Sequence, residues 1–376
     1  MAAPRQIYIA VIGVGGVGRC FMSQLATLSQ RLSKSPSNPT NLLPILIARS
    51  SKVLFSNDYR PLSFDTWEDD LAKSTQKPLA LDEIVQVLAK APGKVVLIDN
   101  TSNQDVANAY PDFLRHGINV VTPNKKAFSG SYQLWKSIFA VSATGAAGGG
   151  HVFHESSVGA GLPVISTLKD LVETGDEVRR IEGVFSGTMS FLFNSFAPLG
   201  GGGGKFSAEV RKAKDLGYTE PDPRDDLNGL DVARKLTILA RLAGLPISSP
   251  NSFPVQSLIP GPLESVSSGD EFLARLPEFD DQMEAVKAEA AAEGKVVRYV
   301  GSVDVASGNV KVGLEKFEPN DPIAALKGSD NIISFHTKRY GGDGSGSPLI
   351  IQGAGAGGEI TAMGVTGDLI KVLNMI

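Results

Sequence analysis

Residues 6–18 read QIYIAVIGVGGVG, an apolar run that leads into glycines spaced as G-x-G-x-x-G. The apolar run predicts a buried strand, and a helix is expected to follow from near Arg19. In such a unit Gly13 permits a tight turn, Gly15 leaves room for a pyrophosphate, and Gly18 lets the helix pack closely. A tight turn that binds nothing is the alternative interpretation. The position at the first strand–helix junction favours a dinucleotide-binding turn.

The next expected strand, Leu42–Ala48, ends in Arg49-Ser50-Ser51-Lys52. A site that prefers NAD usually has Asp or Glu at this position, where the carboxylate holds the ribose hydroxyls. This chain has Arg49 and Lys52 instead. The two cations are either partners of a 2′-phosphate, which favours use of NADP, or simply solvated.

Two further strands are expected to end at the same edge of the sheet. Val95–Asp99 is followed by Asn100 and Thr101, and Ile118–Thr122 is followed by a loop that contains Lys125 and Lys126. Ligands of open parallel sheets bind beyond the carboxyl ends of the strands. Lys125 is therefore a candidate site residue, whereas Lys126 is assigned to the surface.

The composition excludes several classes of protein. The chain has 376 residues, a net charge of −4 and a single cysteine, Cys20. These values disfavour nucleic acid and anionic membranes as partners, exclude an internal disulfide, and suit a reducing compartment. No apolar run is long enough for a membrane span, and residues 1–12 lack a signal-peptide pattern. A cytoplasmic protein is expected.

A second informative stretch runs from Lys212 to Gly244. It contains an acidic turn, with Glu220 and Asp226 among its carboxylates, and then an apolar helix expected to start near Leu227. Asp231 and Lys235 are four residues apart and share one face of that helix. A solvated acidic loop with a surface ion pair is the simpler interpretation. Because the helix is too apolar for the surface, we favour a cleft lined by carboxylates and a lysine.

Residues 217–235, GYTEPDPRDDLNGLDVARK, resemble the signature of homoserine dehydrogenases, in particular the short fungal type that lacks a C-terminal regulatory domain. The resemblance extends from Gly13 to the C-terminus. It implies NAD(P)-dependent interconversion of L-homoserine and L-aspartate-4-semialdehyde, in threonine and methionine biosynthesis, by a homodimer of such chains. The fold it implies is a Rossmann-type doubly wound parallel sheet with an inserted α+β catalytic and dimerisation domain.

Oxidation of an alcohol requires a proton acceptor, and a lysine serves if burial or neighbouring cations lower its pKa. We assign proton transfer to Lys235, oriented by Asp226 and Asp231, whereas Lys125 binds substrate and shares the proton work. Glu220, Asp226 and Asp231 are candidates for the substrate ammonium. The resemblance adds the remaining residues of the substrate pocket: Gly187, Thr188 and Tyr218.

Two other functions are compatible with parts of this pattern. Aspartate-semialdehyde dehydrogenase requires a cysteine nucleophile, and Cys20 lies on the helix after the glycine turn, out of reach of such a site. A non-catalytic NADP-binding regulator on the same fold remains the alternative, although the chain retains both lysines and the acidic turn.

The resemblance also implies residues that hold the cofactor and a monovalent cation, with sodium as the expected ion. The cation ligands would be Glu155, Val158, Ala160 and Leu162, although a structural turn explains these residues equally well. The cofactor-binding set is Gly13, Val14, Gly15, Gly16, Val17, Gly18, Arg49, Ser50, Lys52, Asn100, Thr101, Lys125, Gly217, Glu220 and Gly357.

The expected domains follow from this assignment. Residues 1–153 and 353–376 form the dinucleotide-binding domain, and residues 165–330 form the catalytic substrate domain. Strands near 154–164 and 331–352 are expected to form a dimerisation region.

Overall fold

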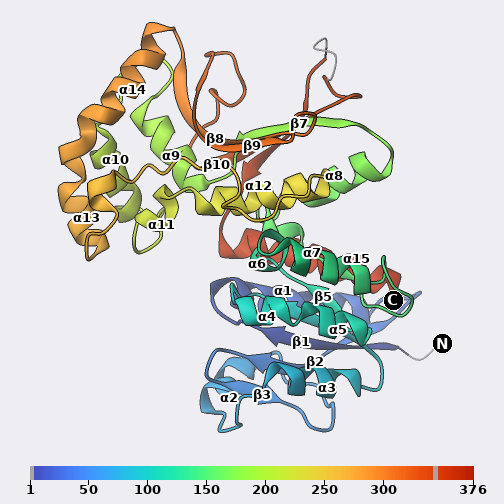
Figure 1. The fold of residues 1–376 in the computed structure, drawn as a ribbon. Coiled ribbons are helices and arrows are strands. Elements are labelled where there is room, and N and C mark those ends of the chain that lie inside the picture. Colours follow the sequence, from blue (N-terminus) through green and yellow to red (C-terminus); the bar gives the residue numbers. More distant parts are fainter. Residues whose placement is uncertain (1–3, 342–345) are drawn as a thin grey trace. The chain divides into compact units, whose positions relative to one another are not determined.

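The computed structural model describes residues 4–341 and 346–376. The chain divides into two compact units (Figure 1). Unit 1 comprises residues 1–161 and 356–376, and unit 2 comprises residues 162–355. Unit 2 is therefore an insertion within the sequence of unit 1. No helix in the described ranges has the length and apolar character needed to cross a membrane.

Unit 1 is built on a six-stranded sheet in the order β3-β2-β1-β4-β5-β6. Every neighbouring pair is parallel except β2 and β3, which are antiparallel. The chain leaves β1 toward β2 on one side and continues from β4 on the other, so the strand order reverses between β1 and β4. The strands are β1 (Arg5–Ile12), β2 (Thr40–Ala48), β3 (Val53–Phe55), β4 (Lys94–Asp99), β5 (Asn119–Val121) and β6 (Val152–Phe153).

Helices α1 and α15 pack together in the main core of unit 1. Phe21 and Leu25 from α1 lie in the same buried cluster as Val365 and Leu369 from α15. The helices of this unit are α1 (Gly16–Ser33), α2 (Trp67–Lys73), α3 (Leu81–Ala89), α4 (Gln104–Asn108), α5 (Tyr110–Arg115), α6 (Lys126–Ser129), α7 (Tyr132–Val141) and α15 (Gly358–Met375), with a 3₁₀ helix η1 (Glu155–Ser157).

Two expectations for unit 1 differ from the structure. Helix α1 begins at Gly16 rather than near Arg19, so the last glycines of the turn form its first turn. The strand expected near 154–164 was wrong, because this segment folds as η1 and a turn. Gly159 and Ala160 have φ values of +77° and +54°, and two successive left-handed residues cannot continue a strand.

Unit 2 contains a five-stranded antiparallel sheet in the order β11-β10-β7-β8-β9. A hairpin joins β8 and β9, with Gly308 in the left-handed conformation that its turn requires. The mixed α/β fold class, with its parallel sheet and inserted α+β unit, is confirmed. The strands are β7 (Val178–Val184), β8 (Val296–Asp304), β9 (Asn309–Phe317), β10 (Asp330–Thr337) and β11 (Leu349–Ala354).

Helix α12 packs on this sheet through Leu236, which lies against Gly301 of β8. It begins at Leu230 rather than near Leu227, because Gly229 has φ +74° and separates it from a short preceding helix. The helices are α8 (Val164–Glu173), α9 (Gly187–Phe196), α10 (Phe206–Asp215), α11 (Arg224–Leu227), α12 (Leu230–Leu242), α13 (Gly269–Arg275) and α14 (Asp280–Ala292), with 3₁₀ helices η2 (Gly261–Leu263) and η3 (Leu276–Phe279).

Candidate functional site

The glycine turn of unit 1 has the geometry that the sequence predicts. Gly13 has φ +88°, and a Cβ there would lie 2.7 Å from Thr101 Cγ2. A Cβ on Gly18 would lie 2.1 Å from the Gly13 carbonyl oxygen, so only glycine fits. A Cβ on Gly15 or Gly16 would meet no atom within 4 Å, which leaves that side of the turn open. Helix α1 has no side-chain cap, and its amino terminus is therefore suited to an anion.

Asn100 lies beside this turn at the end of β4. Its backbone N–H donates to Ile12 O at 2.8 Å. Both polar atoms of its side chain are buried, and neither has a hydrogen-bond partner in the described residues. Its Nδ2 lies 3.6 Å from the position of a Cβ on Gly18. A buried amide without partners is costly, so these residues fit a bound nicotinamide cofactor that completes its hydrogen bonds.

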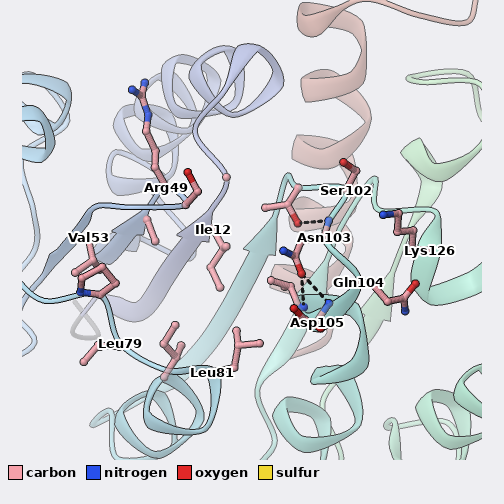
Figure 2. Close-up of a pocket in the computed structure, with 17 residues that line it drawn as sticks. Ile12, Arg49, Val53, Leu79, Leu81, Ser102, Asn103, Gln104, Asp105 and Lys126 are labelled. Atoms are coloured by element: carbon pink, nitrogen blue, oxygen red, sulfur yellow. Dashed lines mark hydrogen bonds between the residues drawn. The ribbon is translucent and has the colours of Figure 1, made fainter. Parts of the chain in front are cut away.

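A cavity of about 520 Å³ opens at the carboxyl ends of the strands of unit 1 (Figure 2). Leu79 and Leu81 belong to its apolar wall, and Ser102 and Asn103 belong to its polar wall. An apolar wall beside polar groups suits the base and sugar of a nucleotide. The sequence did not predict the apolar wall, because the segment between β3 and α3 carries no recognisable pattern. The lining residues are Ile12, Gly13, Ala48, Arg49, Ser50, Val53, Pro78, Leu79, Leu81, Ile84, Thr101, Ser102, Asn103, Gln104, Asp105, Val106 and Lys126.

The basic residues near this cavity differ in position. Arg49 and Ser50 line the cavity, and Arg49 Nη2 donates to Val14 O of the glycine turn at 3.2 Å. Lys52 Nζ instead donates to Ala72 O of α2, and Lys52 is not a lining residue. Lys126, which the sequence analysis assigned to the surface, is half-buried and lines the cavity. Lys126 is the first residue of α6, which places it at this cavity.

A buried hydrogen-bond network holds the loop that carries Lys125. Tyr110 Oη donates to Asp99 Oδ2 at 2.5 Å, and Asn124 Nδ2 donates to the same oxygen at 3.0 Å. Thr122 Oγ1 donates to the Asp99 carbonyl oxygen at 2.7 Å. Burial raises the pKa of Asp99, while the bonds from its neighbours oppose this shift. The network ties the ends of β4 and β5 together and fixes the backbone before Lys125.

In unit 2, Lys235 is buried, with 7% of the residue exposed. Its Nζ donates to Phe185 O at 2.7 Å and forms an ion pair with Asp231 Oδ2 at 2.7 Å. Phe185 O also accepts a hydrogen bond from Asn331 Nδ2 at 3.0 Å. The shared face of Asp231 and Lys235 agrees with the predicted helical spacing. Asn331 was missed, since it lies far away in sequence and belongs to no motif.

Asp226 fastens the acidic turn to the start of α9. Its Oδ2 accepts from Glu220 N at 2.8 Å, and its Oδ1 lies 2.9 Å from Thr188 Oγ1. The Thr188 hydroxyl also lies 2.7 Å from Tyr218 O. Burial raises the pKa of Asp226, and the charges of Glu220 and Asp231 raise it further. The predicted residues Asp226, Glu220, Thr188 and Tyr218 therefore lie together.

Other carboxylates of the acidic turn have a structural role. Asp222 accepts several hydrogen bonds from Arg224, whose Nη1 also donates to Val266 O at 2.8 Å. Tyr218 is 42% exposed, and its ring stacks on Phe191 with 4.6 Å between centroids. Gly217 has φ +75° and follows the end of α10 in the left-handed conformation common after helices. The turn is thus braced by Arg224 rather than solvated throughout.

The residues predicted to hold a cation belong to both units. Glu155, Val158 and Ala160 lie in unit 1, whereas Leu162 begins unit 2. Glu155 Oε2 pairs with Lys371 Nζ at 3.2 Å. The described part of the chain holds no group of three His, Cys, Asp or Glu residues arranged for a metal ion. The monovalent cation remains a prediction.

Gly357 precedes α15 with φ +109°, and a Cβ there would meet no atom within 4 Å. The neighbouring Gly358 is close to α1, since a Cβ on it would lie 3.2 Å from Cys20 Sγ and 3.6 Å from Gly16 O. Gly357 is therefore near the start of α1 within unit 1, as its predicted cofactor role requires.

The reversal of strand order, the glycine turn and the adjoining cavity define a Rossmann-type nucleotide-binding protein. The family model described as "Homoserine dehydrogenase, NAD binding domain" matches residues 13–154, and the model described as "Homoserine dehydrogenase" matches residues 163–370. The chain belongs to the homoserine dehydrogenase family. The functional class predicted by the resemblance, an NAD(P)-dependent homoserine dehydrogenase, is confirmed.

Curated relatives agree over the whole chain. A homoserine dehydrogenase of Emericella nidulans is 59% identical, with 100% of both chains covered. One from Saccharomyces cerevisiae is 50% identical, with 97% of this chain and 98% of that protein covered. A bifunctional aspartokinase/homoserine dehydrogenase of Arabidopsis thaliana is 42% identical, but only 38% of its length is covered. The match to the short fungal type is confirmed.

Solved structures support the same fold. A Candida auris protein described as of unknown function is 47% identical, with a TM-score of 0.91 and 99% of both chains covered. A hyperthermophilic archaeal homoserine dehydrogenase in complex with NADPH has a TM-score of 0.68 at 22% identity, with 99% of this chain and 98% of that chain covered. At that identity the likeness concerns the fold alone.

Proposed function

We propose that the chain interconverts L-homoserine and L-aspartate-4-semialdehyde and that Lys235 transfers the proton of the reacting oxygen. The observation that supports this role is the fixed, buried ammonium of Lys235, which lies 2.7 Å from both Phe185 O and Asp231 Oδ2. A lysine held by two acceptors keeps its Nζ in one place, as proton transfer within a bound complex requires.

When bound, the nicotinamide supplies or accepts the hydride. During aldehyde reduction the carbonyl oxygen gains the electron pair of its π bond and takes a proton from the Lys235 ammonium. During homoserine oxidation, neutral Lys235 accepts the hydroxyl proton. The Asp231 carboxylate steadies the ammonium before the proton leaves, and its attraction for the cation favours return of the proton.

The substrate also carries an ammonium and a carboxylate. We assign the ammonium to Glu220, Asp226 and Asp231, which are carboxylates of the acidic turn and of α12. Lys125 is assigned to the substrate carboxylate and to a share of the proton transfer. The pocket walls are assigned to Gly187, Thr188 and Tyr218.

For the cofactor we propose that NADP is used, with Arg49 as a partner of the 2′-phosphate. The position of Arg49 at the cavity supports this role, and Arg49→Glu should weaken NADPH far more than NADH. Equal losses for both cofactors would place Arg49 elsewhere.

Four further expectations remain proposals, and they concern a cation, the oligomeric state, a domain boundary and the cellular location. These are a monovalent cation at Glu155, a homodimer formed through residues 154–164 and 331–352, a catalytic domain at 165–330, and a cytoplasmic location. A sodium titration of activity, light scattering, limited proteolysis and cell fractionation test them in turn. A mass equal to one chain at assay concentration would contradict the dimer.

The reaction itself is tested by a steady-state assay with L-homoserine and either cofactor, in which the aldehyde product is trapped and identified. We expect turnover with homoserine and none with L-alanine, which has no side-chain hydroxyl. Cofactor binding without turnover would instead favour the non-catalytic NADP-binding regulator.

A further inference from the structure

Two arginines of unit 1 converge on one carboxylate. Arg19 Nη2 lies 2.6 Å from Glu68 Oε1, and Arg49 Nη2 lies 3.7 Å from the same oxygen. Arg19 belongs to the first turn of α1, Arg49 follows β2, and Glu68 belongs to the first turn of α2. Three separate elements thus bring their charges to the place beyond the carboxyl end of β2.

Helix α2 is anchored so that Glu68 faces this place. The neighbouring Trp67 is 8% exposed and Leu71 is 2% exposed, and both belong to the main core of unit 1. Lys52 Nζ donates to Ala72 O, and Ser74 Oγ donates to Val53 O at 2.6 Å. These hydrogen bonds hold the C-terminal end of α2 against Lys52 and Val53, which follow β2. The Glu68 side chain itself is 51% exposed.

The Arg49 side chain extends away from the apolar residues Leu79 and Leu81 of the cavity (Figure 2). Its Nη2 reaches both Val14 O of the glycine turn and the Glu68 carboxylate. An NAD site has its acid on the strand end itself, where it binds the ribose hydroxyls. Here Arg49 stands at the end of β2, and α2 brings the carboxylate of Glu68 to within 3.7 Å of it.

We infer that Glu68 is a specificity-determining residue that restrains the preference for NADP over NAD. This inference rests on the proposed role of Arg49 toward a 2′-phosphate. The phosphate and the Glu68 carboxylate are both anions that require the same guanidinium groups. The 2′-phosphate of NADP must therefore displace the Glu68 carboxylate from the arginines or bind beside this like charge. The uncharged 2′-hydroxyl of NAD can instead donate a hydrogen bond to the carboxylate.

The test measures equilibrium binding of NADPH and NADH by nucleotide fluorescence, which needs no turnover. Glu68→Gln keeps the shape of the side chain and removes its charge. We expect NADPH to bind about two- to tenfold more tightly, because exposed ion pairs of this kind contribute modestly. NADH should bind equally or more weakly. The gain for NADPH should shrink in high salt, since the interaction is exposed.

Asp69→Asn is the matched control, because it removes the same charge from the same exposed turn of α2 and Asp69 forms no ion pair among the described residues. An unchanged NADPH-to-NADH ratio in Glu68→Gln would overturn the inference, as would an equal effect of Asp69→Asn. In Glu68→Gln combined with Arg49→Ala the gain should disappear, and its persistence would also overturn the inference. Failure of the wild type to bind either nucleotide would instead refute the proposed function.

Discussion

The glycine turn of unit 1 depends on the shape of the backbone, whereas the lysine site of unit 2 depends on side chains. The turn depends on backbone shape, with Gly13 and Gly18 placed where a Cβ would collide with neighbouring backbone or side-chain atoms. The lysine site depends on side chains from distant segments, since Lys235 is held by Phe185 O, which also accepts from Asn331. A backbone motif is local and readable in sequence, whereas a site of convergent side chains requires the fold.

The largest effect on activity is expected from removing the lysine of the lysine site. Lys235→Ala should lower kcat by roughly a hundredfold or more, the usual range for loss of a general acid–base group. KM should change less, because other residues are assigned to the charged ends of the substrate. Lys125→Ala should change KM as well as kcat. Near-normal kcat in a folded Lys235→Ala protein that binds cofactor would move the proton transfer to Lys125 or water.

The next largest effect, on stability, is expected from a substitution in the glycine turn. In Gly18→Ala the new methyl would start 2.1 Å from Gly13 O, so the backbone must shift. We expect a loss of about 1–3 kcal/mol in the free energy of unfolding, together with weaker cofactor binding. Gly16→Ala is the control, because no atom lies within 4 Å of its Cβ position and alanine favours helices. Equal denaturation midpoints for the two variants would contradict this account of the turn.

A comparable effect concerns the network beneath Lys125. Tyr110→Phe removes the hydroxyl that donates to Asp99 Oδ2, while Asn124 and the Thr101 N–H remain as donors. Loss of one donor to a buried carboxylate should lower the free energy of unfolding by about 1–3 kcal/mol. Chemical denaturation measures this change. Equal stability of Tyr110→Phe and the wild type would show that the network does not stabilise the fold.

The smallest effect separates stability from function at Asp226. Because burial raises the pKa of Asp226 in the folded state, its protonated form is favoured by folding. The stability that the folded state gains from protonated Asp226 is fully present below the pKa of this residue in the unfolded chain. It is lost as the pH rises through the higher pKa of Asp226 in the folded state. In Asp226→Asn, the new oxygen can accept from Glu220 N, and the new amide can donate to Thr188 Oγ1.

The melting temperature of Asp226→Asn should therefore equal or slightly exceed that of the wild type at pH 7, and the difference should vanish in acid. Activity at pH 7 should nevertheless fall, because the carboxylate beside the substrate is lost. Melting curves between pH 4 and pH 8, with an activity assay at pH 7, measure both. A clear loss of stability at pH 7 would mean that the charge of Asp226 stabilises the fold.

Much of the candidate site was readable from local patterns. The spacing of glycines predicted the turn, and the four-residue spacing predicted that Asp231 and Lys235 share one face of a helix, where they form an ion pair. Segment boundaries depend also on contacts between distant residues. Helix α12 begins at Leu230 because Gly229 adopts φ +74° beneath Tyr299, and no local pattern reveals a contact with a residue so distant in sequence.

The strand expected near 154–164 failed for a related reason. Its apolar residues suit a strand, but Ala160 adopts φ +54° and Glu155 N donates to Asp368 Oδ2 of α15 at 2.7 Å. The distant helix supplies a buried acceptor that favours a turn. Sequence reasoning had no means of placing Asp368 there.

The amino-acid sequence by itself determined the parallel sheet, the glycine turn, the acidic turn and the two candidate lysines, because each depends on residues close together in the chain. Only the tertiary structure decided which side chains surround them. Asn331 reaches Phe185 O, Glu68 reaches Arg19 and Arg49, and Tyr110 reaches Asp99 only after the strands and helices have packed. The reason is that burial and charge pairing act between groups near in space, whatever their separation along the chain.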